Sequence, residues 1–151
     1  MKRILTILLG IIILGLIIGI YMYQNPTELV TSGEPDIKYN TINELVDKGN
    51  SEIDSVFNAN HVGKKIQFHA MVESTTSNES GSTIFVNSGS ENTIITAAFD
   101  ASLSNEVLDL KPSTEIDLLC VCNGIAKPED PDDLLSETTI SFNRCSIINK
   151  N

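Results

Sequence analysis

The chain has 151 residues, with 20 acidic and 10 basic side chains, and 41% of its residues are hydrophobic. All of the acidic residues follow residue 23, whereas Lys2 and Arg3 precede the first apolar segment, so the bulk of the chain is strongly anionic. Such a charge repels nucleic-acid backbones, whose binding proteins usually carry a basic patch. The residues that follow residue 23 are enough for one small domain.

An unbroken apolar run extends from Ile4 to Tyr23, directly behind Lys2 and Arg3. About 20 helical residues span roughly 30 Å, the thickness of the hydrocarbon core of a bilayer. The run is longer than the apolar region of a cleaved signal peptide, which is the alternative, and no small-x-small cleavage site comes after it. Residues 1–23 are therefore predicted to form an uncleaved transmembrane helix, with the two cations holding the N-terminus in the cytoplasm.

Two elements are predicted between this anchor and the main domain. Residues 24–39 contain prolines and a glycine without apolar periodicity, which indicates a linker. Residues 40–60 are predicted to form an amphipathic helix, which can break at Gly49 and Asn50, and residues 58–63 connect it to the first strand of the main domain. The helix is indicated by apolar side chains that recur at spacings of three and four residues: Ile42, Leu45, Val46, Ile53, Val56 and Phe57.

Residues 61–149 contain five stretches with strand character: Lys65–Ser74, Thr83–Asn87, Thr93–Phe99, Glu115–Asn123 and Thr138–Ile148. Between the third and the fourth, residues 101–110 repeat apolar side chains with helical spacing. An immunoglobulin-type sandwich has about seven strands and no such helix. The order instead predicts a mainly-β fold, a five-stranded oligonucleotide/oligosaccharide-binding (OB) barrel with a helix between strands 3 and 4. An amphipathic helix and a transmembrane helix precede it.

Four short segments of this domain share their order and spacing with a known pattern. It is similar to that of the tRNA-anticodon-like (tRNA_anti-like) OB-fold family of bacterial proteins, which are often membrane-anchored or exported. The resemblance covers residues 60–148, and the family's name does not imply tRNA binding or catalysis. Ala70 and Ser113 stand where the family usually has glycine, which affects turn geometry. The segments are Val62-Gly63-Lys64-Lys65-Ile66-Gln67-Phe68, Leu110-Lys111-Pro112-Ser113-Thr114-Glu115-Ile116, Cys122-Asn123-Gly124 and Phe142-Asn143-Arg144-Cys145-Ser146-Ile147.

The resemblance also bears on the three cysteines. Cys122 and Cys145 occupy the two matched family positions on the last two strands, which a hairpin joins in the barrel, so a Cys122–Cys145 disulfide is expected. Cys120 lies two residues away on the same face and is an alternative partner for Cys145. Three buried thiols without any disulfide are the third arrangement.

Other polar residues give no catalytic or metal site. Glu129, Asp130, Asp132 and Asp133 cluster in one loop, but their spacing does not match a calcium-binding loop, and a solvated loop is expected. His61 and His69 lack a partner at a recognisable spacing and are expected at the surface. Phe85 and Phe99 are the aromatics of the second and third strands and are expected in the core.

Together these features predict a single-pass protein of the bacterial cell membrane whose OB domain lies outside the cytoplasm, in the periplasm. The predicted function is a non-enzymatic binding or interaction module without a cofactor or metal. The membrane is contacted through residues 4–23, and the further partner is an unidentified protein or small molecule. A module that binds single-stranded nucleic acid is the alternative, although the acidic charge and the absence of tryptophan make nucleic acid a poor partner.

Overall fold

A computed structural model describes residues 14–15, 31–128 and 137–150 of the chain. Apart from Leu14 and Gly15, the predicted anchor lies outside these residues, as does the acidic segment 129–136. Within the described ranges, no helix has both the length and the apolar character needed to cross a membrane.

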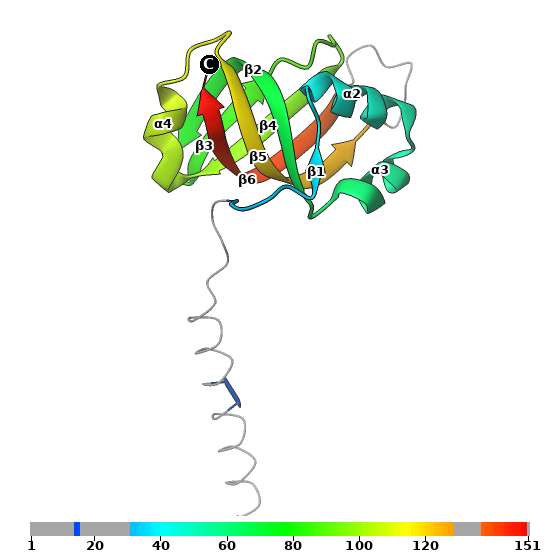
Figure 1. Ribbon diagram of the computed structural model, residues 1–151, viewed down its shortest axis with the longest axis horizontal. Helices are drawn as coiled ribbons and strands as arrows, with labels where there is room; N and C mark the ends of the chain where they lie inside the picture. Colours follow the sequence, from blue (N-terminus) through cyan, green and yellow to red (C-terminus); the bar gives the residue numbers. More distant parts are fainter. Residues whose placement is uncertain (1–13, 16–30, 129–136, 151) are drawn as a thin grey trace, which may run out of the picture.

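The elements of the domain are arranged along the chain as one short strand, two helices, three strands, a helical segment and two strands (Figure 1). Their bounds are β1 Ile37–Lys38, α2 Ile42–Ser51, α3 Asp54–His61, β2 Lys65–Asn78, β3 Gly81–Val86, β4 Thr93–Asp100, a 3-10 turn Ala101–Leu103, α4 Ser104–Leu108, β5 Glu115–Ala126 and β6 Thr138–Lys150.

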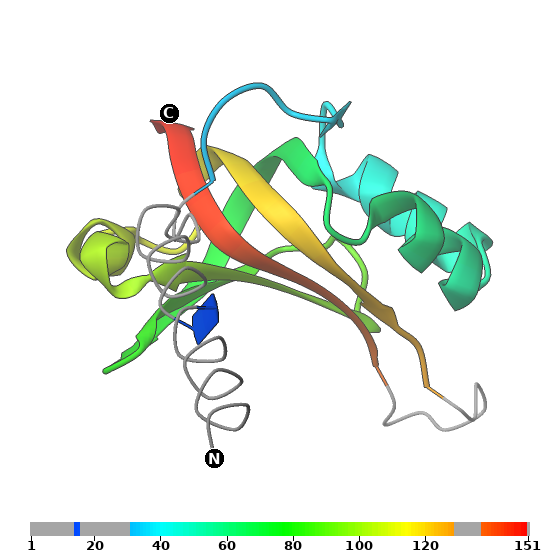
Figure 2. The ribbon, with the colours of Figure 1, turned by 90° about the horizontal axis from the view of Figure 1, so that it is seen from below.

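The strands β2 to β6 close into a barrel. The sheet order is β1-β2-β3-β4-β6-β5, and an additional β2–β5 pairing joins the two ends of the five-strand set. Within the barrel, β4 and β6 pair in parallel, whereas the other neighbours are antiparallel. Figure 2 shows β5 and β6 crossing the domain side by side. This order, with α4 between the third and fourth barrel strands, is that of an OB-fold and confirms the predicted five-stranded barrel with its intervening helix.

The interior of the barrel is formed by the alternate side chains of each strand. On β2, the four residues predicted to share the inner face, Ile66, Phe68, Ala70 and Val72, are all buried. Phe68 packs on Phe142 of β6 with ring centroids 4.9 Å apart, so the first and last barrel strands meet in the core. The β4 strand alternates buried and half-buried residues along its whole length.

The predicted helix of residues 40–60 is divided into two. The helix α2 ends at Ser51, Glu52 and Ile53 are extended, and α3 begins at Asp54, so the break lies two residues beyond Gly49–Asn50. The predicted apolar face holds in α2 and for Phe57, but not for Ile53 and Val56, which are 73% and 45% exposed. Ile53 is itself one of the two extended residues, so the helical spacing on which the prediction depends is interrupted there and does not carry over to Val56 of α3. The predicted connection at 58–63 is mostly helical, because α3 runs to His61.

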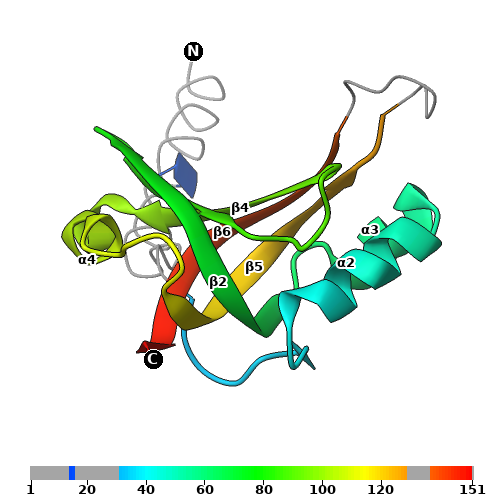
Figure 3. The ribbon, with the colours of Figure 1, turned by 90° about the horizontal axis from the view of Figure 1, so that it is seen from above.

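Helices cover the barrel on two opposite sides. Figure 3 shows α4 on one side of the barrel and the α2–α3 pair on the other. Val107 of α4, and Leu45 and Phe57 of the α2–α3 pair, are completely buried in the same hydrophobic core as the strands. The amide of Asn58 on α3 also bonds to the backbone of Ile125 on β5, accepting from its N–H at 2.8 Å and donating to its carbonyl at 3.2 Å. The helices are therefore part of the barrel domain.

The described part of the predicted linker also lies against the barrel. The N–H of Thr31 donates to the carbonyl of Arg144 at 2.8 Å, and β1 runs parallel to β2 with Ile37 opposite Ile66. The hydroxyl of Tyr39 reaches His61 at 2.8 Å. Residues 31–39 thus form hydrogen bonds with the domain, which the lack of apolar periodicity in the sequence does not reveal.

Ser113, in the turn before β5, adopts a left-handed backbone conformation with φ of 68°. This is the position at which the resembling family usually has glycine, the residue that tolerates this conformation without a steric penalty from Cβ. The turn is nevertheless kept, since the N–H of Ser113 donates to the carbonyl of Val72 at 2.7 Å.

Replacing Ser113 by glycine is expected to raise the free energy of unfolding by about 0.5–1 kcal/mol, because it removes the strain of a left-handed non-glycine residue. Chemical denaturation of the two proteins measures the difference. The control is Ser55→Gly on the exposed side of α3, which is expected to lower stability by about 0.5 kcal/mol through the poor helix propensity of glycine. Equal losses from both substitutions would show that Ser113 is not strained.

Candidate functional site

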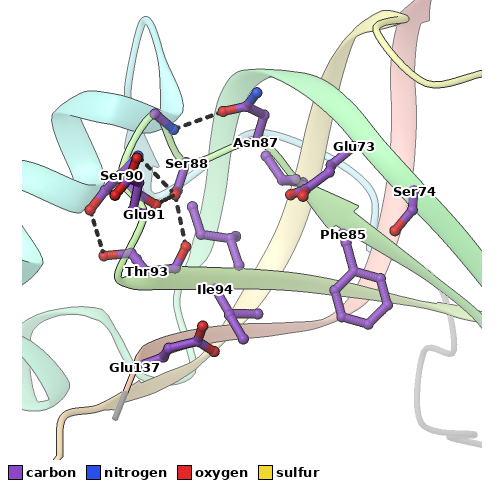
Figure 4. A pocket seen from close by; sticks show the side chains of 13 residues that line it. Glu73, Ser74, Phe85, Asn87, Ser88, Ser90, Glu91, Thr93, Ile94 and Glu137 are labelled. Atoms are coloured by element: carbon purple, nitrogen blue, oxygen red, sulfur yellow. Dashed lines mark hydrogen bonds between the residues drawn. The ribbon is translucent and has the colours of Figure 1, made fainter. Parts of the chain in front are cut away.

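A pocket of about 460 Å³ lies on the outer surface of the barrel, over β2, β3 and β4 (Figure 4). The strands β3 and β4 form its floor, and the connection between them forms one side. Glu137, the residue before β6, lies at another side. The lining residues are Glu73, Ser74, Phe85, Val86, Asn87, Ser88, Gly89, Ser90, Glu91, Thr93, Ile94, Ile95 and Glu137. Its volume falls in the range of sites that bind small molecules.

The connection between β3 and β4 is fixed by its own hydrogen bonds. The hydroxyl of Ser88, which is buried, lies 2.8 Å from the carbonyl of Ser90 and 2.7 Å from that of Thr93. The N–H of Ser90 donates back to Ser88 Oγ at 3.1 Å, and the N–H of Gly89 donates to Asn87 Oδ1 at 2.8 Å. A loop held in this way presents a preformed wall to a ligand.

The pocket combines an apolar floor with a negatively charged rim. Phe85 and Ile94 project outward from β3 and β4 and are half-buried. Three carboxylates, those of Glu73, Glu91 and Glu137, are exposed around them. Figure 4 shows Glu73 and Glu137 on two sides of Ile94. Within the described ranges, no lysine, arginine or histidine lines the pocket.

Phe85 was expected in the core, and this expectation is wrong. Ile84 and Val86 are buried, so the alternation of β3 places Phe85 on the outer face. Strict alternation in this segment was the signal that could have located Phe85. Phe99, by contrast, is 4% exposed and belongs to the core, as predicted. No sequence pattern marked Glu73 or Glu137, because they come together only when β2 and β6 are placed in the barrel.

The structure pairs Cys145 with Cys120 and leaves Cys122 as a buried free thiol, so the expected Cys122–Cys145 disulfide is corrected. The reason is the register of β5 and β6. Cys122 lies opposite Phe142, and Leu119 opposite Ser146, with an irregularity between them. The irregularity is a bulge in β6 that contains Arg144, whose φ is 49°. The bulge brings Cys145 opposite Cys120, with 4.1 Å between their Cα atoms.

Burial controls the chemistry of the remaining thiol. Burial of Cys122 in the apolar interior raises its pKa to about 11, although the N–H of Gly124 acts weakly in the opposite direction. The reactive form of a cysteine is the thiolate, so Cys122 is a packing residue with little reactivity in the folded protein.

His61 is buried, which corrects the expectation that it lies at the surface. Its Nδ1 donates to the carbonyl of Phe57 at 2.8 Å, so its Nε2 accepts the hydrogen bond from the hydroxyl of Tyr39 at 2.8 Å. Its ring also stacks on that of Phe57 at a centroid distance of 4.1 Å. Burial, together with the negative charge of Glu52, raises the pKa of Tyr39. His61 therefore fastens the segment before α2 to α3.

His69 is half-buried on the outer face of β2 and has carboxylate partners on β5. Its Nδ1 lies 2.9 Å from Asp117 and its Nε2 3.9 Å from Glu115. These partners are 46 or more residues away along the chain, so their spacing gave no signal in the sequence. In the part of the chain that the structure describes, no group of three or more histidine, cysteine or acidic side chains is placed to hold a metal ion. Glu129, Asp130, Asp132 and Asp133 lie outside that part.

Neither a protein-family model nor a curated protein sequence matches the chain. Among solved structures, similarity is found to a protein of Leishmania major described as an aspartyl-tRNA synthetase, with 14% identity and a TM-score of 0.44 over 80% of this chain. A structure of a replication protein A heterotrimer bound to single-stranded DNA is similar with 14% identity and a TM-score of 0.42. The match covers 75% of this chain and 81% of the replication protein A chain. An asparaginyl-tRNA synthetase of Entamoeba histolytica is similar with 10% identity and a TM-score of 0.42 over 78% of this chain.

The chain spans only 22% of the length of the Leishmania protein and 25% of the Entamoeba one. These sequence identities and TM-scores are too low for a ligand or an activity to be transferred to this chain. The OB-fold assignment rests on the strand order, the parallel β4–β6 pairing and the closing β2–β5 pairing described above.

Thiol labelling is expected to show one reactive cysteine, Cys122, and only after unfolding. Without reductant, maleimide at mildly acidic pH should leave the folded chain unlabelled and add one group to the denatured chain, because Cys120 and Cys145 are bonded to each other. Reduction before labelling should give three groups. Peptide mapping by mass spectrometry locates the label, and a label on Cys120 in the unreduced sample would restore the Cys122–Cys145 pairing.

Proposed function

We propose that this protein is a non-catalytic binding module, held at the bacterial cell membrane by residues 4–23, whose OB domain lies outside the cytoplasm. The pocket over β3 and β4 is its ligand site, and a protein or a small molecule is its partner. The observation that carries the proposal is the position of this preformed pocket. In OB-folds, the face of the second and third barrel strands is the usual ligand surface, and here those strands are β3 and β4.

The architecture supports this choice of surface. The core is filled by large side chains from all five barrel strands, and helices pack on two opposite sides of it. A ligand cannot enter such an interior, so it must bind outside. The pocket combines an aromatic ring and a second apolar side chain, which offer contact area, with a larger number of polar groups, which can orient a ligand.

Two features of the pocket support a binding role without catalysis. The hydroxyl of Ser88 is engaged with backbone carbonyls, so it is not activated by a base. The titratable side chains that line the described pocket are glutamates exposed to solvent, and no histidine, cysteine or lysine of the described residues lines the pocket with them to act as a partner in proton transfer.

The alternative, binding of single-stranded nucleic acid, is disfavoured by the same pocket. Single-strand binding combines a basic groove with several stacking aromatics. This site offers one aromatic ring, Phe85, and a rim of carboxylates. The OB-fold itself does not decide between these ligand classes.

The location is supported by two observations. The apolar run behind Lys2 and Arg3 has the length and flanking charge of a signal anchor. The Cys120–Cys145 disulfide is of a kind that persists in oxidising compartments such as the periplasm and is rare in the cytoplasm.

Protease accessibility is expected to place the domain outside the cytoplasm. In cells that produce the full chain, added protease should not reach the domain while the outer membrane is intact. It should digest the domain once the outer membrane is opened and the inner membrane remains sealed. Immunoblotting measures the loss of full-length protein, with a cytoplasmic protein as the control. Protection of the domain in opened cells would contradict the proposed orientation.

A photoreactive amino acid at Ser74, which lines the pocket, is expected to form a specific adduct in cells, because a bound partner would lie against it. The matched control carries the same amino acid at Asn50, an exposed residue near the end of α2 that does not line the pocket. Gel shift and mass spectrometry compare the two. Adducts of equal yield and identity at both positions, or no adduct at Ser74, would contradict a ligand site on this face, and a nucleic-acid adduct would favour the alternative.

A further inference from the structure

The charge and the aromatic content of the pocket define a chemical class of ligand. We propose that the pocket binds an organic cation, an alkylammonium or guanidinium group, with Glu73 and Glu137 as counter-charges and Phe85 as the ring against which the cation rests. This inference rests on the proposed function, because it specifies the ligand of the same site.

In the described part of the chain, the carboxylates of the rim form no ion pair with a basic side chain. The described lysine ion pairs are made with other acids: Lys48 with Glu52, Lys127 with Asp54 and Lys150 with Glu106. None of the ion pairs found in residues 31–128 and 137–150 includes Glu73, Glu91 or Glu137. The negative charge of the pocket is therefore left for a ligand to neutralise.

The carboxylates surround an apolar floor. Phe85 and Ile94 come from adjacent strands, and Figure 4 shows both side chains in the pocket with Glu73 and Glu137 near them. An aromatic face attracts a cation through its quadrupole, and this attraction adds to that of nearby carboxylates. The methylene groups of a lysine, an arginine or a polyamine would cover the apolar surface while the charged end meets a carboxylate.

The same arrangement disfavours an anionic ligand. A phosphate or a carboxylate in this space would be repelled by three glutamates and would find no cationic side chain among the described lining residues. An uncharged ligand would gain contact with Phe85 and Ile94 but nothing from the rim. An organic cation is the ligand that uses both parts of the site.

The test is titration of the full-length ¹⁵N-labelled chain, in a non-ionic detergent, with spermidine and with an acetylated tri-lysine amide. Saturable shifts are expected for backbone amides of residues 85–94, and the affinity should fall as salt is raised. Glu73→Gln with Glu137→Gln is expected to weaken binding about fivefold, the sum of two partly exposed charge contacts. Phe85→Leu is expected to weaken it about threefold.

The matched control is Glu34→Gln with Glu79→Gln, which removes the same net charge from exposed positions that do not line the pocket, one before β1 and one in the β2–β3 turn. It should leave affinity within about twofold, because distant surface charges are screened. Thermal unfolding of each variant confirms that it is folded. Equal weakening by both double variants, shifts confined to other residues, or no saturable binding of either cation would overturn the inference.

Further ligands separate this inference from the function on which it rests. Binding of spermidine alone indicates a small-molecule source of the cation, and binding of the peptide indicates a protein source; both support the inference. If maltohexaose or a thymidine octamer shifts the pocket amides while the cations do not, the ligand class is wrong and the site stands. If no ligand shifts them and Ser74 yields no adduct, the proposed site fails as well.

Discussion

The structure depends on the pairing of β6 with two strands at once. Residues 139–142 of β6 lie between β4, which they meet in parallel, and β5, which they meet antiparallel. This double pairing closes the sheet, because β5 returns to β2 at the other side. Beyond it, the bulge at Arg144 shifts the register and sets Cys145 opposite Cys120. The disulfide then joins the last two strands covalently.

Closure determines where function can reside. A closed barrel has no free edges at its joined strands and an interior filled by side chains. The α2–α3 pair and α4 add Leu45, Phe57 and Val107 to this interior. Concave outer surface is what remains for recognition, and the rigid β3–β4 connection creates it beside Phe85. The carboxylates of Glu73 on β2 and of Glu137, the residue before β6, give this surface its charge.

Much of the fold could be predicted from the sequence, because alternation and helical spacing are local signals. The inner face of β2 and the order of three strands, a helix and two strands are of this kind. The errors arise where a few residues change the register. Ile53 is one of two extended residues that interrupt the helix between α2 and α3, and one bulge places Cys120 rather than Cys122 opposite Cys145. Likewise, the pocket joins residues from distant strands, and His69 meets Asp117 only across the β2–β5 pairing.

Amide hydrogen exchange measured by NMR on the full chain tests the closure of the barrel most directly. If β4 and β6 are paired as described, the hydrogen-bonded amides of 93–97 and 138–142 exchange only through global unfolding, as slowly as those that join β2 to β5. Exchange that is orders of magnitude faster along the facing edges of β4 and β6 would show an open sheet. The argument for a ligand site on the outer face would then no longer hold.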